Sequence, residues 1–153
     1  RTKAPALPGR ARNGNLSQKL PPCGNFPGKK IMEFRLEQPR DIRLVTAHGP
    51  GWVEIDRQRH ETNLILTPET VAPWFEGGFD ALDEPALEPL LALRPELVLI
   101  ATGATLRRPP VPLLRRLAAA GQGFEFMTLA AACRTYNVTA SEGRRVVAGL
   151  ILT

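Results

Sequence analysis

Lysine is missing from most of this sequence: none follows Lys30, so all thirteen basic residues of 32–153 are arginines. That segment therefore has neither a Schiff-base lysine nor the lysine of a Walker-type phosphate-binding loop. Histidine is also scarce, since only His48 and His60 occur, and no cluster of cysteines and carboxylates accompanies them. We expect no metal site and no cofactor.

Cysteines and long apolar runs are equally few. Cys23 and Cys133 form no CxxC pair and no disulfide framework, which favours a reducing compartment. The longest strongly apolar stretches, 97–101 and 146–152, are far too short to span a bilayer, so we expect no membrane insertion. No secretory apolar region follows the basic start of the chain. We expect a location in the bacterial cytoplasm.

Acidic residues are absent from residues 1–31, which contain seven basic residues, five prolines and four glycines. Such a segment buries too little apolar surface to offset its ordering entropy, so we expect disorder. Because the composition changes at Met32, we interpret 1–31 as a disordered basic leader that is foreign to the native domain. A mitochondrial transit peptide, which would place the protein in mitochondria, and a nucleic-acid or membrane-binding arm are the alternatives.

The net charge of +5 is the sum of a leader with a charge of +7 and a remainder with a small negative charge. Residues 32–153 hold thirteen basic and fifteen acidic residues, which gives them a net charge of −2. This balance excludes a generally basic binding protein, and we expect no nucleic acid as a partner.

Short alternating apolar patterns, typical of half-buried strands, follow the leader. They predict strands at 43–48, 52–55 and 63–67. The short connections between these strands favour an antiparallel meander. A helix comes next, and Pro89 requires it to start near Ala86 or to be kinked.

A strand–helix–strand unit occupies the middle of the chain. The continuous apolar run 96–101 predicts a central strand that is covered on both faces. Residues 110–120 predict a helix that ends at Gly121, and 124–127 predict the next strand. Because the two strands flank one crossover helix, we expect them to be parallel with a right-handed connection.

Two helices are predicted at the end of the chain. Thr128 can cap a short helix at 130–134, and the capping-box pattern from Thr139 to Glu142 predicts a second helix at about 140–152. The buried face of this second helix is expected to consist of Val146, Val147, Leu150 and Ile151. Together these elements predict an α/β or α+β domain with a mixed sheet. The antiparallel strands are expected to come first along the chain.

Three stretches carry a family resemblance: 64–74 (LILTPETVAPW), 94–110 (RPELVLIATGATLRRPP) and 133–151 (CRTYNVTASEGRRVVAGLI). In this order and spacing they resemble the family of mitochondrial complex I assembly factor 3, which also contains small bacterial and archaeal proteins of unknown function. The most specific feature is Arg-Thr-Tyr-Asn followed by Glu-x-Arg-Arg-Val. One departure is Ala101-Thr102-Gly103, where the family pattern has Gly-Thr-Gly.

The resemblance implies both a fold and a role. Residues 32–153 are expected to form a single globular α/β domain of three layers, with a mixed central sheet, a β-hairpin layer and flanking helices. The eukaryotic member implies a role in assembling a respiratory complex, and it does not imply a catalysed reaction.

The candidate site lies where two loops, 102–109 and 128–137, should meet beyond the carboxyl ends of the parallel strands. Its candidate ligand- or partner-binding residues are Thr102, Gly103, Arg107, Arg108, Cys133, Arg134, Tyr136 and Asn137. The arginines suit a small anionic ligand or a partner's carboxylate. Structural roles are the alternative: Tyr136 and Asn137 at a break between two helices, and Cys133 as a small buried hydrophobe.

Aromatic residues form a second candidate surface. Trp74, Phe75 and Phe79 flank a pair of glycines, and they can either contact a partner or fold inward over the sheet. The leading hypothesis is a non-catalytic protein-interaction or assembly-factor domain with another protein as its partner. The alternative is a small anionic-ligand-binding protein or an enzyme that uses the two loops.

Overall fold

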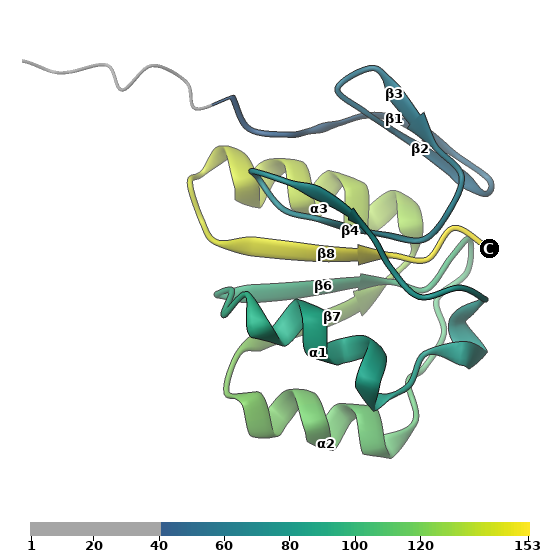
Figure 1. Cartoon of the computed structure of the whole chain (residues 1–153), viewed down its shortest axis with the longest axis vertical. Coiled ribbons are helices and arrows are strands. Elements are labelled where there is room, and N and C mark those ends of the chain that lie inside the picture. Colours follow the sequence, from purple (N-terminus) through teal and green to yellow (C-terminus); the bar gives the residue numbers. More distant parts are fainter. Residues whose placement is uncertain (1–40) are drawn as a thin grey trace, which may run out of the picture. The chain divides into compact units, whose positions relative to one another are not determined.

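The computed structural model describes residues 41–153, which belong to one compact unit (Figure 1). The predicted leader at 1–31 and the domain start at Met32 lie outside the described residues. The described strands are β1 (Val45–Gly49), β2 (Trp52–Ile55), β3 (Gln58–His60), β4 (Leu64–Leu66), β5 (Val71–Pro73), β6 (Leu97–Ala101), β7 (Gly123–Met127) and β8 (Val146–Leu150). The helices are α1 (Glu84–Ala92), α2 (Val111–Ala120) and α3 (Leu129–Ser141), with a 3-10 turn η1 (Phe79–Ala81).

The central sheet is mixed, with the strand order β5-β4-β8-β6-β7. β6 is parallel to both β7 and β8, whereas β4 is antiparallel to β8 and to β5. The predicted unit of two parallel strands around one helix is thus confirmed by β6, α2 and β7. Its helix ends as expected, because Gly121 adopts φ +71° directly after α2.

The domain has three layers, with one apolar core on each side of the central sheet. The three-stranded sheet β1-β2-β3 and α3 lie on one side of the central sheet, and α1 and α2 lie on the other (Figure 1). Side chains of β1, β2 and α3 share one core cluster with the central strands, and side chains of α1 and α2 share the other. The predicted three-layer fold is confirmed for residues 41–153. None of the helices in this part of the chain is long and apolar enough to cross a membrane.

The helix predicted at 140–152 is wrong, because this segment contains β8. Gly143 adopts φ +77° just after α3, and all five residues of β8 are buried between β4 and β6. A strand that is covered on both faces loses its alternation of polar and apolar residues, so its pattern cannot be told from that of a buried helix. The short helix predicted at 130–134 is instead the first part of the longer α3.

The predicted meander is correct for β1 and β2 but wrong for the third strand. β4 lies in the central sheet, where its three residues are all buried. The strand that pairs with β2 is β3, which the sequence patterns did not predict, and β5 was missed as well. β3 contains Gln58 and Arg59, which are exposed, so it has little apolar pattern to recognise.

Candidate functional site

α3 carries the Arg-Thr-Tyr-Asn segment as part of one continuous helix, so no break between two helices exists at Tyr136 or Asn137. The Tyr136 hydroxyl donates to the Arg43 carbonyl oxygen at 2.9 Å. The Asn137 side-chain amide binds Val45 twice: its Oδ1 accepts from the Val45 N–H at 2.9 Å, and its Nδ2 donates to the Val45 carbonyl at 2.8 Å. Both residues therefore hold the β1-β2-β3 layer on α3.

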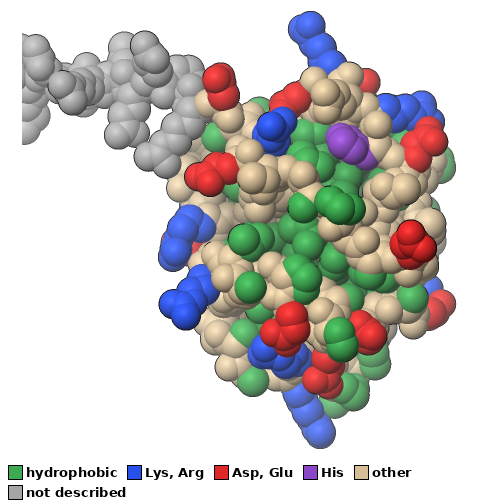
Figure 2. Space-filling view, in the orientation of Figure 1, with side chains coloured by type: hydrophobic (Ala, Val, Ile, Leu, Met, Phe, Trp, Pro, Cys, Tyr) green, Lys and Arg blue, Asp and Glu red, His purple; other side chains and the backbone are tan. Residues whose placement is uncertain are grey.

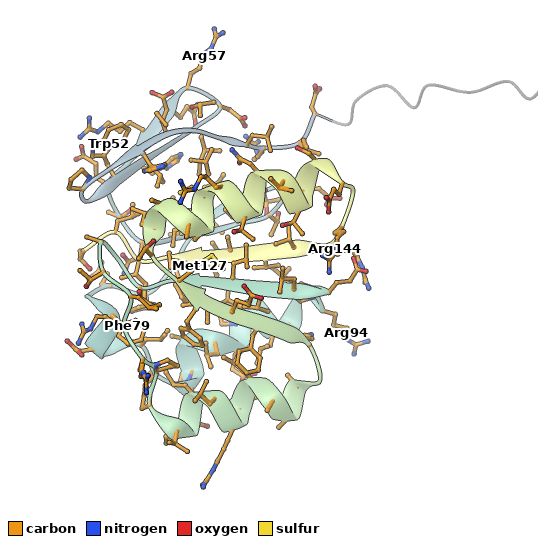
Figure 3. All side chains as sticks on the ribbon, turned by 180° about the vertical axis from the view of Figure 1, so that it is seen from behind. Trp52, Arg57, Phe79, Arg94, Met127 and Arg144 are labelled. Atoms are coloured by element: carbon orange, nitrogen blue, oxygen red, sulfur yellow. The ribbon has the colours of Figure 1, made fainter. Side chains whose placement is uncertain are left out.

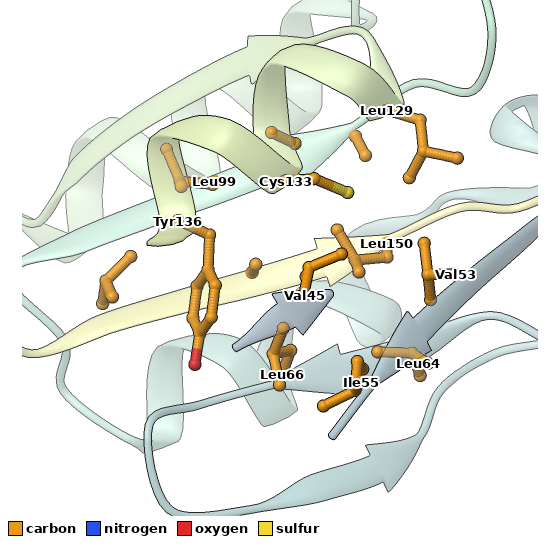
Figure 4. Packing of buried hydrophobic residues seen from close by; sticks show 14 of the residues in the cluster. Val45, Val53, Ile55, Leu64, Leu66, Leu99, Leu129, Cys133, Tyr136 and Leu150 are labelled. Carbon is orange, nitrogen blue, oxygen red and sulfur yellow. The ribbon is translucent and has the colours of Figure 1, made fainter. Parts of the chain in front are cut away.

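Cys133 and Tyr136 are buried between α3 and the strands (Figure 4). Burial raises the pKa of the Cys133 thiol to about 11, which keeps it protonated at neutral pH and poorly nucleophilic. Burial also raises the pKa of Tyr136, with a smaller contribution from the negative charge of Asp56. Neither group is placed or ionised for attack on a substrate.

The loop 102–109 meets the start of the segment 128–137 at the carboxyl end of β6, but this second segment is not a loop, because it is helical from Leu129 onward. Leu129 N–H donates to the Gly103 carbonyl oxygen at 2.8 Å, which joins the start of α3 to the loop after β6. The Thr102 hydroxyl donates to the Thr105 carbonyl at 2.7 Å and accepts from the Arg107 N–H at 3.1 Å. Because these two hydrogen bonds of the buried hydroxyl are made within the loop 102–109, Thr102 stabilises the conformation of that loop.

The arginines of the candidate site differ in their surroundings. Arg107 makes a forked ion pair with Asp80, at 3.0 and 2.6 Å, and its guanidinium lies 5.1 Å from the centre of the Phe79 ring. Arg108 and Arg134 are exposed. An anion that approached Arg107 would have to displace Asp80, whereas the other two arginines remain accessible.

The aromatic residues divide between the core and its edge. Phe79 is buried, whereas Trp74 and Phe75 are half-buried and meet edge to face at 4.6 Å between ring centres. Trp74 Nε1 donates to the Ala86 carbonyl at 2.8 Å, which ties the chain after β5 to α1. Trp74 and Phe75 also line a cleft of about 310 Å³ beside Glu76. These residues cover the sheet and present only part of their surface to solvent.

Several residues that shape this region were missed from the sequence. Asp80, the partner of Arg107, stands 27 positions away, and no local signal relates the two. Asn63 is buried: its Nδ2 donates to the Phe75 and Gly77 carbonyls, and its Oδ1 accepts from the Leu152 N–H. A single amide directly before the apolar run of β4 is a signal that could have marked it.

A second groove, of about 340 Å³, lies at the opposite end of the parallel strands. Leu93, Val146 and the arginines 144 and 145 are among its lining residues. Arg94 and Arg144 lie on this same side of the molecule (Figure 3). On the face shown in Figure 2, basic and acidic side chains alternate around α1 and α2 while hydrophobic side chains gather across the middle. No large surplus of one charge marks that face.

The fold and the site define a three-layer α/β domain in which most candidate polar groups connect one layer or loop to another. The chain belongs to the family described as protein of unknown function (DUF498/DUF598), whose model matches residues 45–151. The resemblance found in the sequence is thereby confirmed.

The chain is similar in sequence to bacterial and to mammalian proteins. An uncharacterised protein of Rhodobacter capsulatus is 38% identical over 107 residues, which is 70% of this chain and 82% of that protein. NADH dehydrogenase [ubiquinone] 1 alpha subcomplex assembly factor 3 of Bos taurus is 26% identical over 95% of this chain and 79% of its own length.

Solved structures show the same fold. A Bordetella parapertussis protein matches with a TM-score of 0.69 and 34% identity, over 73% of this chain and 97% of its own. A Bordetella pertussis protein described as an Mth938-like domain matches with a TM-score of 0.66 and 27% identity, over 79% of this chain and 92% of its own.

Proposed function

We propose that this domain binds another protein and, without catalysing a reaction, acts as an assembly factor in the biogenesis of a respiratory membrane complex. The observation that carries the proposal is the similarity of 95% of the chain to the bovine protein, whose name states an assembly role. The proposal includes a location in the bacterial cytoplasm, in keeping with the bacterial relatives, and fractionation of source cells tests that location.

The contacts of the candidate residues support a scaffold. Thr102, Tyr136 and Asn137 direct their polar atoms to backbone groups of the domain itself. Cys133 is buried and protonated at neutral pH. A group that already satisfies a buried backbone atom is costly to redirect to a substrate, because the backbone atom would lose its partner.

A second candidate function uses the loop 102–109 and the segment 128–137, most of which belongs to α3, to bind a small anion. The exposed guanidinium groups of Arg108 and Arg134 favour it, because they can grip a carboxylate or phosphate without breaking an internal ion pair. Calorimetric titration with phosphate and with succinate tests this candidate. Binding that Arg134→Ala abolishes would support it, and no heat with either anion would contradict it.

The assembly role is tested by deleting the gene in the source bacterium. We expect less fully assembled respiratory complex on native gels, and less NADH oxidation by the membranes, with both restored by the wild-type gene. Antibody detection of individual subunits separates failed assembly from failed synthesis. An unchanged amount of assembled complex would show that the proposed role is wrong.

A further inference from the structure

β7 forms one edge of the central sheet, and among the described strands it pairs with β6 alone. Gly123 N–H donates to the Glu96 carbonyl, and the Met127 carbonyl accepts from the Thr102 N–H. Because hydrogen-bonding groups alternate in direction along a strand, Phe124 and Phe126 turn their N–H and C=O groups away from β6. Figure 3 shows β7 between α3 and α2 with no element in front of it.

The two edges of the sheet differ in how they are protected. β5 has three residues and ends in Pro73, which offers no N–H to an added strand. β7 has five residues without proline or lysine, and its one charged residue, Glu125, is exposed. Of the two edges, β7 is therefore the one that can accept another strand along its full length.

A second copy of this chain fits this edge poorly. The centred antiparallel pairing of two β7 strands would bond Phe124 of each copy to Phe126 of the other. It would also set Glu125 directly opposite Glu125, and like charges opposite each other destabilise a strand pair. The same carboxylate attracts a basic residue, so the charge of β7 disfavours self-pairing and favours a different chain.

We propose that the β7 edge binds an extended segment of another protein, which adds a sixth strand to the central sheet. The inference rests on the proposed function, since it specifies how a partner protein is held. Opposite residues of paired strands share a face, so the segment places Lys or Arg opposite Glu125 and apolar residues opposite Phe124 and Phe126. Both phenylalanines are half-buried on the core of α1 and α2 and lie edge to face, 6.4 Å apart.

The probe is a capped peptide, threonine-valine-lysine-valine-threonine, and its matched control has glutamate at the centre. Amide hydrogen exchange is measured by NMR on the full-length chain at millimolar peptide concentration. We expect the lysine peptide to slow exchange at Phe124 and Phe126 at least tenfold, and the glutamate peptide to leave it unchanged. Amides that already bond to β6 serve as the internal reference. Equal exchange with and without the lysine peptide would overturn the proposal.

A charge reversal tests the role of the carboxylate. Glu125→Lys changes an exposed side chain, so the fold is retained. We expect this variant to reverse the preference, so that it binds the glutamate peptide better than the lysine peptide. Glu142→Lys, another exposed acid outside β7, is the matched control and should keep the wild-type preference. A Glu125→Lys variant that still prefers the lysine peptide, or wild-type dimers formed through β7, would contradict the inference.

The deletion strain separates this inference from the proposed function. Suppose that the deletion strain lacks the assembled complex and that the gene for the Glu125→Lys variant restores the complex fully. The assembly role then stands, and the β7 edge is not the surface that binds the partner. If the peptide binds as expected but deletion leaves the complex unchanged, the edge binds a strand and the assembly role is wrong.

Discussion

The side-chain amide of Asn137 forms the two hydrogen bonds with Val45 that a neighbouring strand would form. It accepts from the Val45 N–H and donates to the Val45 carbonyl. The two residues are 92 positions apart, so this contact fixes the β1-β2-β3 layer to α3 across most of the domain. Asn137→Ala leaves both backbone groups without a partner. We expect the free energy of unfolding to fall by about 2 kcal/mol in chemical denaturation.

The neighbouring residue provides the control for this substitution. Val138 lies on the same helix and is 60% exposed, so Val138→Ala should change the free energy of unfolding by less than about 0.5 kcal/mol. Hydrogen exchange at the Val45 amide should accelerate in Asn137→Ala and stay unchanged in Val138→Ala. Equal losses of stability in the two variants would show that the amide does not anchor the layer.

Gly149 of β8 makes room for the ring of Trp74. A Cβ atom at position 149 would lie 2.6 Å from Trp74 Cη2, and the ring is held in place by its bond to Ala86. We expect Gly149→Ala to lower the free energy of unfolding by about 2 kcal/mol through overpacking. The measurement is chemical denaturation monitored by tryptophan fluorescence.

A double-mutant cycle shows whether the ring causes this loss. Trp74→Phe supplies a smaller ring, so the loss in the double variant should be smaller than the sum of the two single losses by at least about 1 kcal/mol. Additive losses would mean that Gly149 is required for its backbone rather than for the space it leaves.

The parts of the fold that follow from local signals were predictable. Gly121 ends α2 and Thr128 begins α3, and in both places a single residue type supplies the backbone conformation or the capping oxygen that the helix end needs. The apolar run of β6 and the length of the crossover were enough to predict its parallel pairing with β7.

The rest depends on contacts that sequence spacing does not encode. β8 resembled a helix because burial on both faces removed its alternation, and its neighbours β4 and β6 come from distant parts of the chain. The contact between the loop after β6 and the start of α3 could be predicted, but the hydrogen-bond partners of Tyr136 and Asn137 could not. Their partners, Arg43 and Val45, lie in a layer whose position only the folded chain defines.

We expect Cys133 to make the free energy of unfolding depend on pH in the alkaline range. Its pKa is raised from 9.0 to about 11 by burial, so the folded protein holds the thiol proton more tightly than the unfolded chain. This contribution is complete below about pH 9 and is lost as the pH rises towards 11, with a slope of about 1 kcal/mol per pH unit. Cys133→Ala should remove that slope, measured as denaturation midpoints between pH 8 and 9.5, below the range in which Tyr136 contributes.

The matching control concerns the other buried acid. Burial raises the pKa of Tyr136 too, so Tyr136 destabilises the fold only above its ordinary pKa of 10.0. Between pH 8 and 9.5, Tyr136→Phe should keep the pH dependence of the wild type while Cys133→Ala reduces it. A Cys133→Ala protein with the full wild-type slope would contradict the assignment.

We expect Arg107 to stabilise the fold more through its contact with the Phe79 ring than through its ion pair with Asp80. Its side chain is 43% exposed and that of Asp80 is 82% exposed, so solvent screens the pair. Asp80→Asn should lower the free energy of unfolding by less than about 1 kcal/mol, and the difference should disappear in 1 M NaCl. Arg107→Ala also removes the guanidinium and stem that cover Phe79, and should cost about 1 kcal/mol more at either salt concentration. Equal losses for the two variants in denaturation experiments would show that the ion pair is the only contribution of Arg107.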